Sequence, residues 1–358
     1  MKESKEKLTI KDKIELKKTM KVYDAIVAEF SRLADYYDEI RSLGSHRHFI
    51  LDEIEENVLK LIELDEKVLG LHSRTKNNIG IIACCNYCPK VALRALDNEK
   101  AQTITSDFGD YNIGMWAVHY GLEEVALKAL DNEQARRQRN NNWETIAMMA
   151  AKQGMEEVVL KALDDKVSSM YTDDFNKNLG MYAAENGLAR ATMKALENEN
   201  LSVKQSLECG FNIGMYAVES GLEDCVIKAL DNKMASLQSC NIIFANMGML
   251  AARKGMVNAT IKALKNPDAR KQIDNRGCTI YDYAVEYELH PVVDAYLEMM
   301  EEKDREIKNT SRLIDLVDEI SDFSQKDDKS VETKDTEIEI IDTEIETIDT
   351  EDVSTMEN

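Results

Sequence analysis

The sequence predicts an all-α protein built as a solenoid of helix-turn-helix repeats, because two sequence markers recur with one period. The first marker is Asn-Ile-Gly or a close variant, and its copies start 33 or 34 residues apart, at positions 78, 112, 145, 178, 212 and 246. The second is Ala-Leu, which keeps the same spacing at Ala95, Ala129, Ala162, Ala195, Ala229 and Ala263. Two independent markers in phase, with a period in this range, indicate stacked supersecondary units.

Each unit is predicted to hold two short antiparallel helices, as residues 178–198 illustrate. Asn178 has the side-chain oxygen that caps a helix N-terminus, and Gly187 provides the positive φ at which that helix ends. The second helix is expected from Leu188 to Glu197, with Lys194 near its C-terminal end, where the helix dipole favours a cation. Helices of this length are marginal alone in water, so each must bury its apolar side against neighbouring units.

The residues of this unit resemble the ankyrin repeat family. The family pattern Gly-x-Thr-Pro-Leu-His-x-Ala-Ala-x-x-Gly is similar to Thr-Ile-Ala-Met-Met-Ala-Ala-Lys-Gln-Gly at residues 145–154, and also to residues 274–284. Asn mostly replaces Thr, and Asn132-Glu133-Gln134 stands where the family has a Gly-Ala-Asp turn, which leaves open whether β-hairpin fingers form. The resemblance spans about residues 78–300 and implies an ankyrin-like solenoid; a two-helix repeat of another family is the alternative.

The flanks differ in composition from the array and define five predicted regions. Residues 1–20 are expected to form a charged N-terminal arm, and residues 21–77 a helical region with a half-repeat that caps the array. Residues 78–300 form the ankyrin-like array of about seven units, and residues 301–323 a C-terminal helix. Residues 324–358 carry 13 acidic residues and 3 lysines, so we predict a disordered, acidic, low-complexity tail.

Composition and charge exclude several classes of protein. The net charge of −22 argues against a nucleic-acid or anionic-membrane binder, and it favours a monomer that resists self-association. No apolar run is long enough to span a membrane. The charged N-terminus lacks the apolar core of a signal peptide, and seven cysteines suit a reducing compartment. A cytoplasmic location is therefore expected, with delivery into a host cell left open.

No motif in the sequence predicts an enzyme. The chain has no glycine-rich phosphate loop, no Gly-x-Ser-x-Gly and no His-Glu-x-x-His, so neither a catalytic residue nor a cofactor is predicted. Cys84 and Cys88 form a Cys-x-x-Cys, but a zinc site would need two more ligands of similar spacing, so no metal is predicted. Their positions within the repeat favour structural cysteines that fill small apolar sites; a thiol function is the alternative.

The predicted partner-binding site comprises the two residues just before each helix-ending glycine. These positions change charge and size from one repeat to the next while their neighbours hardly vary: His119, Tyr120, Lys152, Gln153, Glu185, Asn186, Glu219, Ser220, Arg253 and Lys254. In ankyrin proteins the corresponding region lies along the concave groove that binds partners, which the resemblance implies here. The alternative is that exposed residues simply drift.

A second candidate surface is the basic cluster of Arg136, Arg137 and Arg139, in an otherwise acidic array. It is either a solvated loop or a patch for an acidic partner, which includes the acidic tail of the same chain.

These observations together predict a non-catalytic protein–protein interaction module that binds a protein partner through the groove and loops of the solenoid. A long surface of near-identical units allows exposed residues to vary without disturbing the core. The alternative is a host-directed effector or inhibitor with an unrecognised enzymatic activity. A purely structural, self-assembling role is a third class that the acidic balance and the cap-like ends disfavour.

Overall fold

A computed structural model describes residues 10–43, 47–73 and 76–327. The chain divides into two units, residues 1–296 and 297–358. The described part of the chain contains helices and three isolated β-bridges but no strand, as the predicted all-α class requires. None of the described helices is long and apolar enough to cross a membrane. The acidic tail lies outside the described residues from position 328 onward.

The first unit begins with two long helices, α1 (Ile10–Leu43) and α2 (Arg47–Leu64), followed by the 3-10 helix η2 (Glu66–Gly70). Helix α1 starts inside the segment that was expected to be a charged arm. The buried face of this helix extends one turn before Tyr23. Thr19 is buried and its hydroxyl donates a 2.5 Å hydrogen bond to Asp65, while Tyr23, Ile26 and Phe30 continue the same buried face.

The first six repeats hold three helices each, where two were predicted. The first helix, which we call inner, is seven residues long in every repeat: α3 (Ile79–Cys85), α6 (Ile113–His119), α9 (Ile146–Lys152), α12 (Leu179–Glu185), α15 (Ile213–Glu219), α18 (Met247–Arg253) and α21 (Ile280–Glu286). The second, which we call outer, runs antiparallel to it: α4 (Pro89–Ala95), α7 (Glu123–Ala129), α10 (Glu156–Leu163), α13 (Ala189–Leu196), α16 (Glu223–Ala229) and α19 (Val257–Lys265).

The third helix is a short one that the two-helix prediction missed. Its copies are α5 (Glu99–Thr103), α8 (Glu133–Arg137), α11 (Lys166–Ser169), α14 (Glu199–Ser202), α17 (Lys233–Leu237) and α20 (Pro267–Lys271). It begins where the Gly-Ala-Asp turn of ankyrin repeats is missing. The side chain of Asn132 accepts a 2.8 Å hydrogen bond from the backbone N–H of Ala135, so the Asn-Glu-Gln sequence at this place is a capped helix start.

The last helix, α22 (His290–Asp327), is continuous and includes residues 301–323, for which a C-terminal helix was expected. No proline or glycine follows Pro291 in this segment, so nothing in the sequence interrupts the helix. Its apolar residues Ile307, Leu313 and Val317 are exposed.

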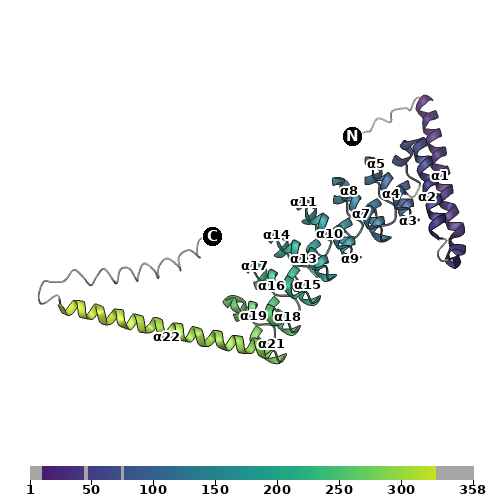
Figure 1. The fold of residues 1–358 in the computed structure, drawn as a ribbon. Helices are drawn as coiled ribbons and strands as arrows, with labels where there is room; N and C mark the ends of the chain where they lie inside the picture. The colour runs from purple at the N-terminus through teal and green to yellow at the C-terminus, as the bar shows by residue number, and fades with distance from the viewer. Residues whose placement is uncertain (1–9, 44–46, 74–75, 328–358) are drawn as a thin grey trace. The chain divides into compact units, whose positions relative to one another are not determined.

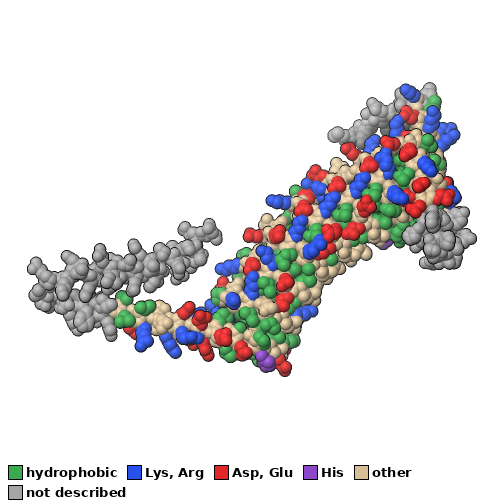
Figure 2. All heavy atoms as spheres, viewed as in Figure 1, with side chains coloured by type: hydrophobic (Ala, Val, Ile, Leu, Met, Phe, Trp, Pro, Cys, Tyr) green, Lys and Arg blue, Asp and Glu red, His purple; other side chains and the backbone are tan. Residues whose placement is uncertain are grey.

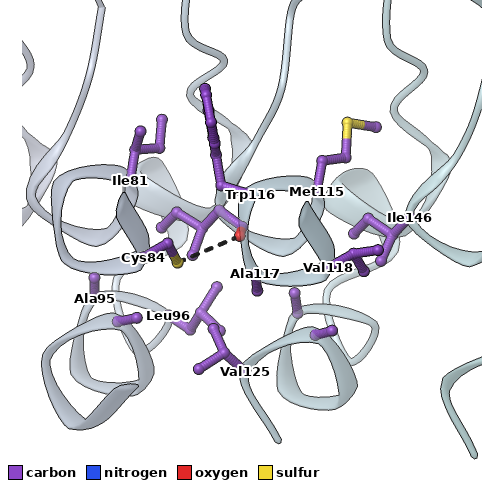
Figure 3. Close-up of a cluster of buried hydrophobic side chains, with 14 of the residues drawn as sticks. Ile81, Cys84, Ala95, Leu96, Met115, Trp116, Ala117, Val118, Val125 and Ile146 are labelled. Atoms are coloured by element: carbon purple, nitrogen blue, oxygen red, sulfur yellow. Dashed lines mark hydrogen bonds between the residues drawn. The ribbon is translucent and has the colours of Figure 1, made fainter. Parts of the chain in front are cut away.

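The core of the array lies between successive repeats, because each inner helix packs on the next inner helix and each outer helix on the next outer helix (Figure 1). Figure 3 shows this packing between α3, α6 and α9: the Cys84 thiol lies against the carbonyl of Ile113, and Val118 lies near Ile146. The alanine pair Ala183-Ala184 is fully buried, which lets helix backbones approach closely. This arrangement confirms the predicted solenoid.

In five repeats, a buried asparagine forms hydrogen bonds to both the first and the third helix. The side-chain oxygen of Asn212 caps α15 by accepting a 3.0 Å hydrogen bond from Met215 N–H, and its amide donates to the Ala235 carbonyl at the end of α17. Asn78, Asn112, Asn178 and Asn246 make the same pair of bonds. The recurring asparagine therefore joins the first and third helices of its repeat.

The outer helices are tied together by lysines and glutamates. Lys194 reaches back to the Leu160 carbonyl of the preceding outer helix at 3.0 Å, and also pairs with Asp164. Lys194 therefore stabilises the preceding outer helix as well as the C-terminal end of its own helix. Glu223 caps the next outer helix by accepting hydrogen bonds from Asn258 and Ala259 N–H. Acidic and basic side chains are accordingly interleaved along the array in Figure 2.

Candidate protein-binding groove

Short turns project between the third helix of one repeat and the inner helix of the next. Each of these finger turns is closed by a backbone hydrogen bond; in one, Asp173 N–H donates to the Lys177 carbonyl at 3.1 Å. The finger turns comprise residues 106–111, 140–144, 173–177, 206–211, 240–245 and 274–278. Among described residues, antiparallel pairing here is limited to isolated bridges such as Thr172 with Asn178. Turns therefore stand where ankyrin repeats have β-hairpins.

Aromatic side chains on the inner helices hold several finger turns in place. The Tyr182 hydroxyl donates a 2.5 Å hydrogen bond to Asp173, and the Tyr283 hydroxyl donates a 2.9 Å bond to Asp274. Burial together with the Asp173 carboxylate raises the pKa of Tyr182 well above its ordinary value, so its hydroxyl stays a donor. Trp116 donates to the Ser106 hydroxyl at 3.1 Å and is buried.

The inner helices and finger turns enclose two adjoining hollows. The larger, about 500 Å³, is lined by side chains that include Glu144, Lys152, Asp174, Lys177, Tyr182 and Glu208. The second, about 400 Å³, shares Lys177, Glu185 and Glu208 with the first and adds Phe211, Tyr216, Glu219 and Ser220. We call this pair of hollows, with the inner-helix ends on either side, the groove.

The ten predicted site residues all lie at the C-terminal ends of inner helices, and all are exposed or half-buried. Four of them line the two hollows: Lys152, Glu185, Glu219 and Ser220. The other six, His119, Tyr120, Gln153, Asn186, Arg253 and Lys254, stand at the same register on the flanking helix ends.

Ion pairs organise the charged residues of the groove. Lys177, which the sequence reasoning missed, is buried, with its ammonium 2.8 Å from Glu185 and about 5 Å from the ring centroids of Tyr182 and Tyr216. Lys152 pairs with Glu144 and lies over the Tyr182 ring. One signal could have revealed Lys177: the position just before the helix-capping residue also varies from repeat to repeat.

The N-terminal part of the groove is aromatic rather than charged. The Tyr120 ring stacks on Trp116 with centroids 5.7 Å apart and meets Tyr87 edge-on at 5.3 Å. His119 packs edge-on against Trp116 at 5.6 Å. Toward the C-terminal end, Arg253 and Lys254 both pair with Glu219, at 2.7 and 2.6 Å. The surface chemistry therefore changes along the groove, from aromatic to mixed charge to basic.

The repeating unit of this chain is thus an antiparallel helix pair with a period of 33 or 34 residues, preceded by a projecting turn that folds onto the inner helix. The repeat is ankyrin-like. In place of the β-hairpin finger, each ankyrin-like repeat has a one-turn helix and a finger turn, a change that follows from the asparagine cap at Asn132 and its equivalents.

Comparisons with known proteins add the following. The ankyrin repeat domain of Bcl-3, a member of the IkappaB family, matches with a TM-score of 0.48 and 13% identity, over 61% of this chain and 97% of that one. A chain from the complex of the predatory endopeptidase Bd0816 of Bdellovibrio bacteriovorus with the immunity protein Bd3460 matches with a TM-score of 0.42 and 18% identity, over 52% and 96%. No protein-family model and no curated protein matches the sequence. The ankyrin-like assignment rests on the repeat geometry described above.

The arginine cluster lies at the end of α8 and is largely engaged within the array. Arg136 pairs with Asp165 at 2.6 Å, and Arg137 pairs with Glu133 at 2.6 Å. The Arg139 guanidinium lies 4.2 Å from the ring centroid of Trp143. Two of the three charges are therefore already balanced by carboxylates of this chain. The predicted contact with the acidic tail involves residues outside the described ones.

The cysteines occupy apolar positions in the array. Cys84 and Cys88 are buried, and no group of three metal-binding side chains occurs within the described ranges. Burial raises the pKa of Cys88 to about 12 and that of Cys84 well above its ordinary value, so both thiols stay protonated near neutral pH. The thiolate is the reactive form, and these two cysteines are accordingly poor nucleophiles.

We expect Cys84 and Cys88 of the folded protein to resist iodoacetamide at pH 8, while half-exposed Cys209 and Cys278 are alkylated. Peptide mass spectrometry with and without urea measures this, and unfolding should make all four react at similar rates. Rapid alkylation of Cys84 in the native protein would contradict the structural role and favour a thiol function.

Proposed function

We propose that this ankyrin-like array is a non-catalytic module that binds a protein partner through its groove. The observation that carries the proposal is the contrast between two layers of each repeat. The buried layer repeats nearly unchanged, as the asparagine cap, the alanine pair and the helix-ending glycine do. The inner-helix ends above it change in every repeat, from His119-Tyr120 to Arg253-Lys254. A fixed scaffold with a varied surface suits recognition of another macromolecule.

The chemistry of the groove supports binding better than catalysis. Several of its acidic and basic side chains are engaged in ion pairs, such as Lys177 with Glu185 and Glu219 with Lys254. The aromatic end offers exposed Tyr87 and half-buried Tyr120, and tyrosine is among the residue types that most often dominate binding energy at protein interfaces. A partner that lies along the groove would meet an aromatic anchor site first and charged sites beyond it.

The test compares affinity capture from a cell lysate by the intact chain and by two variants. The groove variant carries Tyr120→Ala, Lys152→Ala, Glu185→Gln, Glu219→Ala and Arg253→Ala; glutamine at 185 keeps an acceptor for buried Lys177. The control variant carries five exposed outer-helix substitutions: Glu124→Ala, Glu157→Ala, Asp224→Ala, Lys228→Ala and Asn258→Ala.

We expect the groove variant to lose the dominant captured protein by at least about tenfold, because several interface side chains are removed together. The control variant should retain it, and circular dichroism with thermal unfolding should show both variants folded. The proposal would be contradicted if the groove variant still captured the protein and the control variant, with its outer-helix substitutions, did not.

A further inference from the structure

Large apolar side chains stand exposed on the finger turns. Phe108, Trp143, Phe175, Leu207, Ile242 and Phe244 are between 47 and 70% exposed. We call these six residues the finger ridge. Single exposed apolar residues are ordinary on protein surfaces, but a contiguous series of them marks an interaction site.

Backbone hydrogen bonds join several pairs of successive turns in this series. Asn141 N–H donates to the Gly109 carbonyl at 3.1 Å, and Leu207 N–H donates to the Phe175 carbonyl at 2.8 Å. The next pair, Asn241 with Cys209, is joined at 2.8 Å. Neighbouring finger turns therefore hold their tips beside one another, and the ridge runs along the same edge as the groove, whose lining includes Phe175.

Two ridge residues are kept in a backbone conformation that does not suit them. Trp143 has a φ of 61° and Phe244 a φ of 56°, in the left-handed region, where an L-residue costs roughly 1–2 kcal/mol. Glycine occupies the same place in two other turns, as Gly210 and Gly277. Both aromatic rings nevertheless remain about half in water. Backbone strain of this kind is typical of functional sites.

Carboxylates with no ion-pair partner flank the ridge. Asp110, Asp174 and Glu208 are exposed on the finger turns, and none of them makes an ion pair within the part of the chain that the structure describes. Of the nearby cations, Lys76 pairs with Asp107 at 3.0 Å, Lys177 pairs with Glu185, and Arg139 lies over the Trp143 ring. The finger edge thus combines apolar side chains with exposed carboxylates that lie outside ion pairs.

We propose that the finger ridge docks a protein segment in which large apolar side chains are interspersed with Lys or Arg. The apolar side chains of the segment would pack on the ridge, and its cations would lie against Asp110, Asp174 and Glu208. Like charges would oppose an acidic segment at the same place, so the carboxylates select the partner as well as attract it. This inference rests on the proposed function, since it names the class of partner that the same array binds.

The probes for the test are three synthetic peptides of equal length. The first combines Leu and Phe with Lys and Arg, the second combines the same apolar residues with Asp and Glu, and the third combines Lys and Arg with Ser. Fluorescence anisotropy of the labelled peptides with the full chain should give saturable binding of the first peptide, at least about tenfold tighter than the other two.

Three variants of the chain locate the peptide-binding site. The ridge variant Phe108→Ser, Phe175→Ser, Leu207→Ser should weaken binding of the first peptide at least about tenfold. The control Leu64→Ser, Val167→Ser, Met234→Ser removes equally exposed apolar side chains elsewhere and should leave it unchanged. A third variant, Asp110→Asn, Asp174→Asn, Glu208→Gln, should make the binding less sensitive to salt.

Several results would overturn the inference: equal binding of the acidic apolar peptide, unchanged binding by the ridge variant, or saturable binding of none of the three. The proposed function is judged separately, by the lysate capture. A partner lost by the groove variant but retained by the ridge variant would sustain the groove proposal while refuting the finger ridge.

Discussion

Replacing Asn212 with alanine is expected to lower the free energy of unfolding by about 2–4 kcal/mol. The change removes the cap of α15, which typically contributes about 1 kcal/mol. It also leaves the buried carbonyl of Ala235 and the side chain of Gln238 without their amide donor, a loss of about 1–3 kcal/mol. Urea unfolding followed by circular dichroism measures the sum.

Two further substitutions separate the contribution of the helix cap from that of the amide donor of Asn212. Threonine at this position keeps the capping oxygen but removes the amide donor, as Thr145 does naturally in its own repeat, so we expect an intermediate loss. Alanine at exposed Asn258 should change the free energy of unfolding by less than about 0.5 kcal/mol. If Asn212→Ala unfolds at the wild-type urea concentration, the asparagine does not tie the repeat together.

The second large effect is expected at Gly180, which lies where two repeats make their closest approach. A Cβ placed there would lie 2.5 Å from the Ile213 side chain and 2.7 Å from the Ala195 Cβ, both closer than side chains allow. The Ile213 side chain can rotate away, but the Cβ of Ala195 is fixed to its backbone and cannot. We expect Gly180→Ala to cost about 1–3 kcal/mol despite the higher helix propensity of alanine.

The array itself suggests how to compensate that substitution. In the repeat that begins at Thr145, the same place holds Ala147, and the facing residue of the next repeat is Leu179 instead of isoleucine. Gly180→Ala combined with Ile213→Leu should therefore recover part of the loss in urea unfolding. Additive losses in the double variant would show that the two side chains do not meet.

The repeat period, the helix caps and the helix ends could be predicted because each rests on local chemistry. An asparagine before an apolar run caps a helix whatever surrounds it, and Gly187 has the positive φ that ends one. These signals recur in phase, which separates them from chance.

The third helix and the finger ridge escaped the sequence reasoning for two different physical reasons. Helix α8 is five residues long, too short to show apolar periodicity, and only Asn132 and the following acidic residue mark its start. The ridge residues lie in turns of five or six residues, and they occupy different positions within these turns, so no single repeat position is apolar throughout. Their alignment depends on hydrogen bonds between repeats, which the sequence does not display.

The sequence predicts which residues lie at the inner-helix ends but not the interactions that they make. The ten residues at the inner-helix ends are accessible to a partner, as the variation suggested. The burial of Lys177 between Tyr182 and Tyr216 depends on how two neighbouring repeats stack, so the sequence of a single repeat could not predict it.

Hydrogen–deuterium exchange with and without the captured partner tests the central claim most directly, because it maps the contact onto the chain. Partner binding through the groove predicts slower exchange at the inner-helix ends, including residues 119–120, 152–153 and 185–186, and in the finger turns 173–177 and 206–211. The outer helices α7, α10 and α16 should exchange as they do in the free protein. Protection confined to those outer helices, with the groove unchanged, would contradict the account.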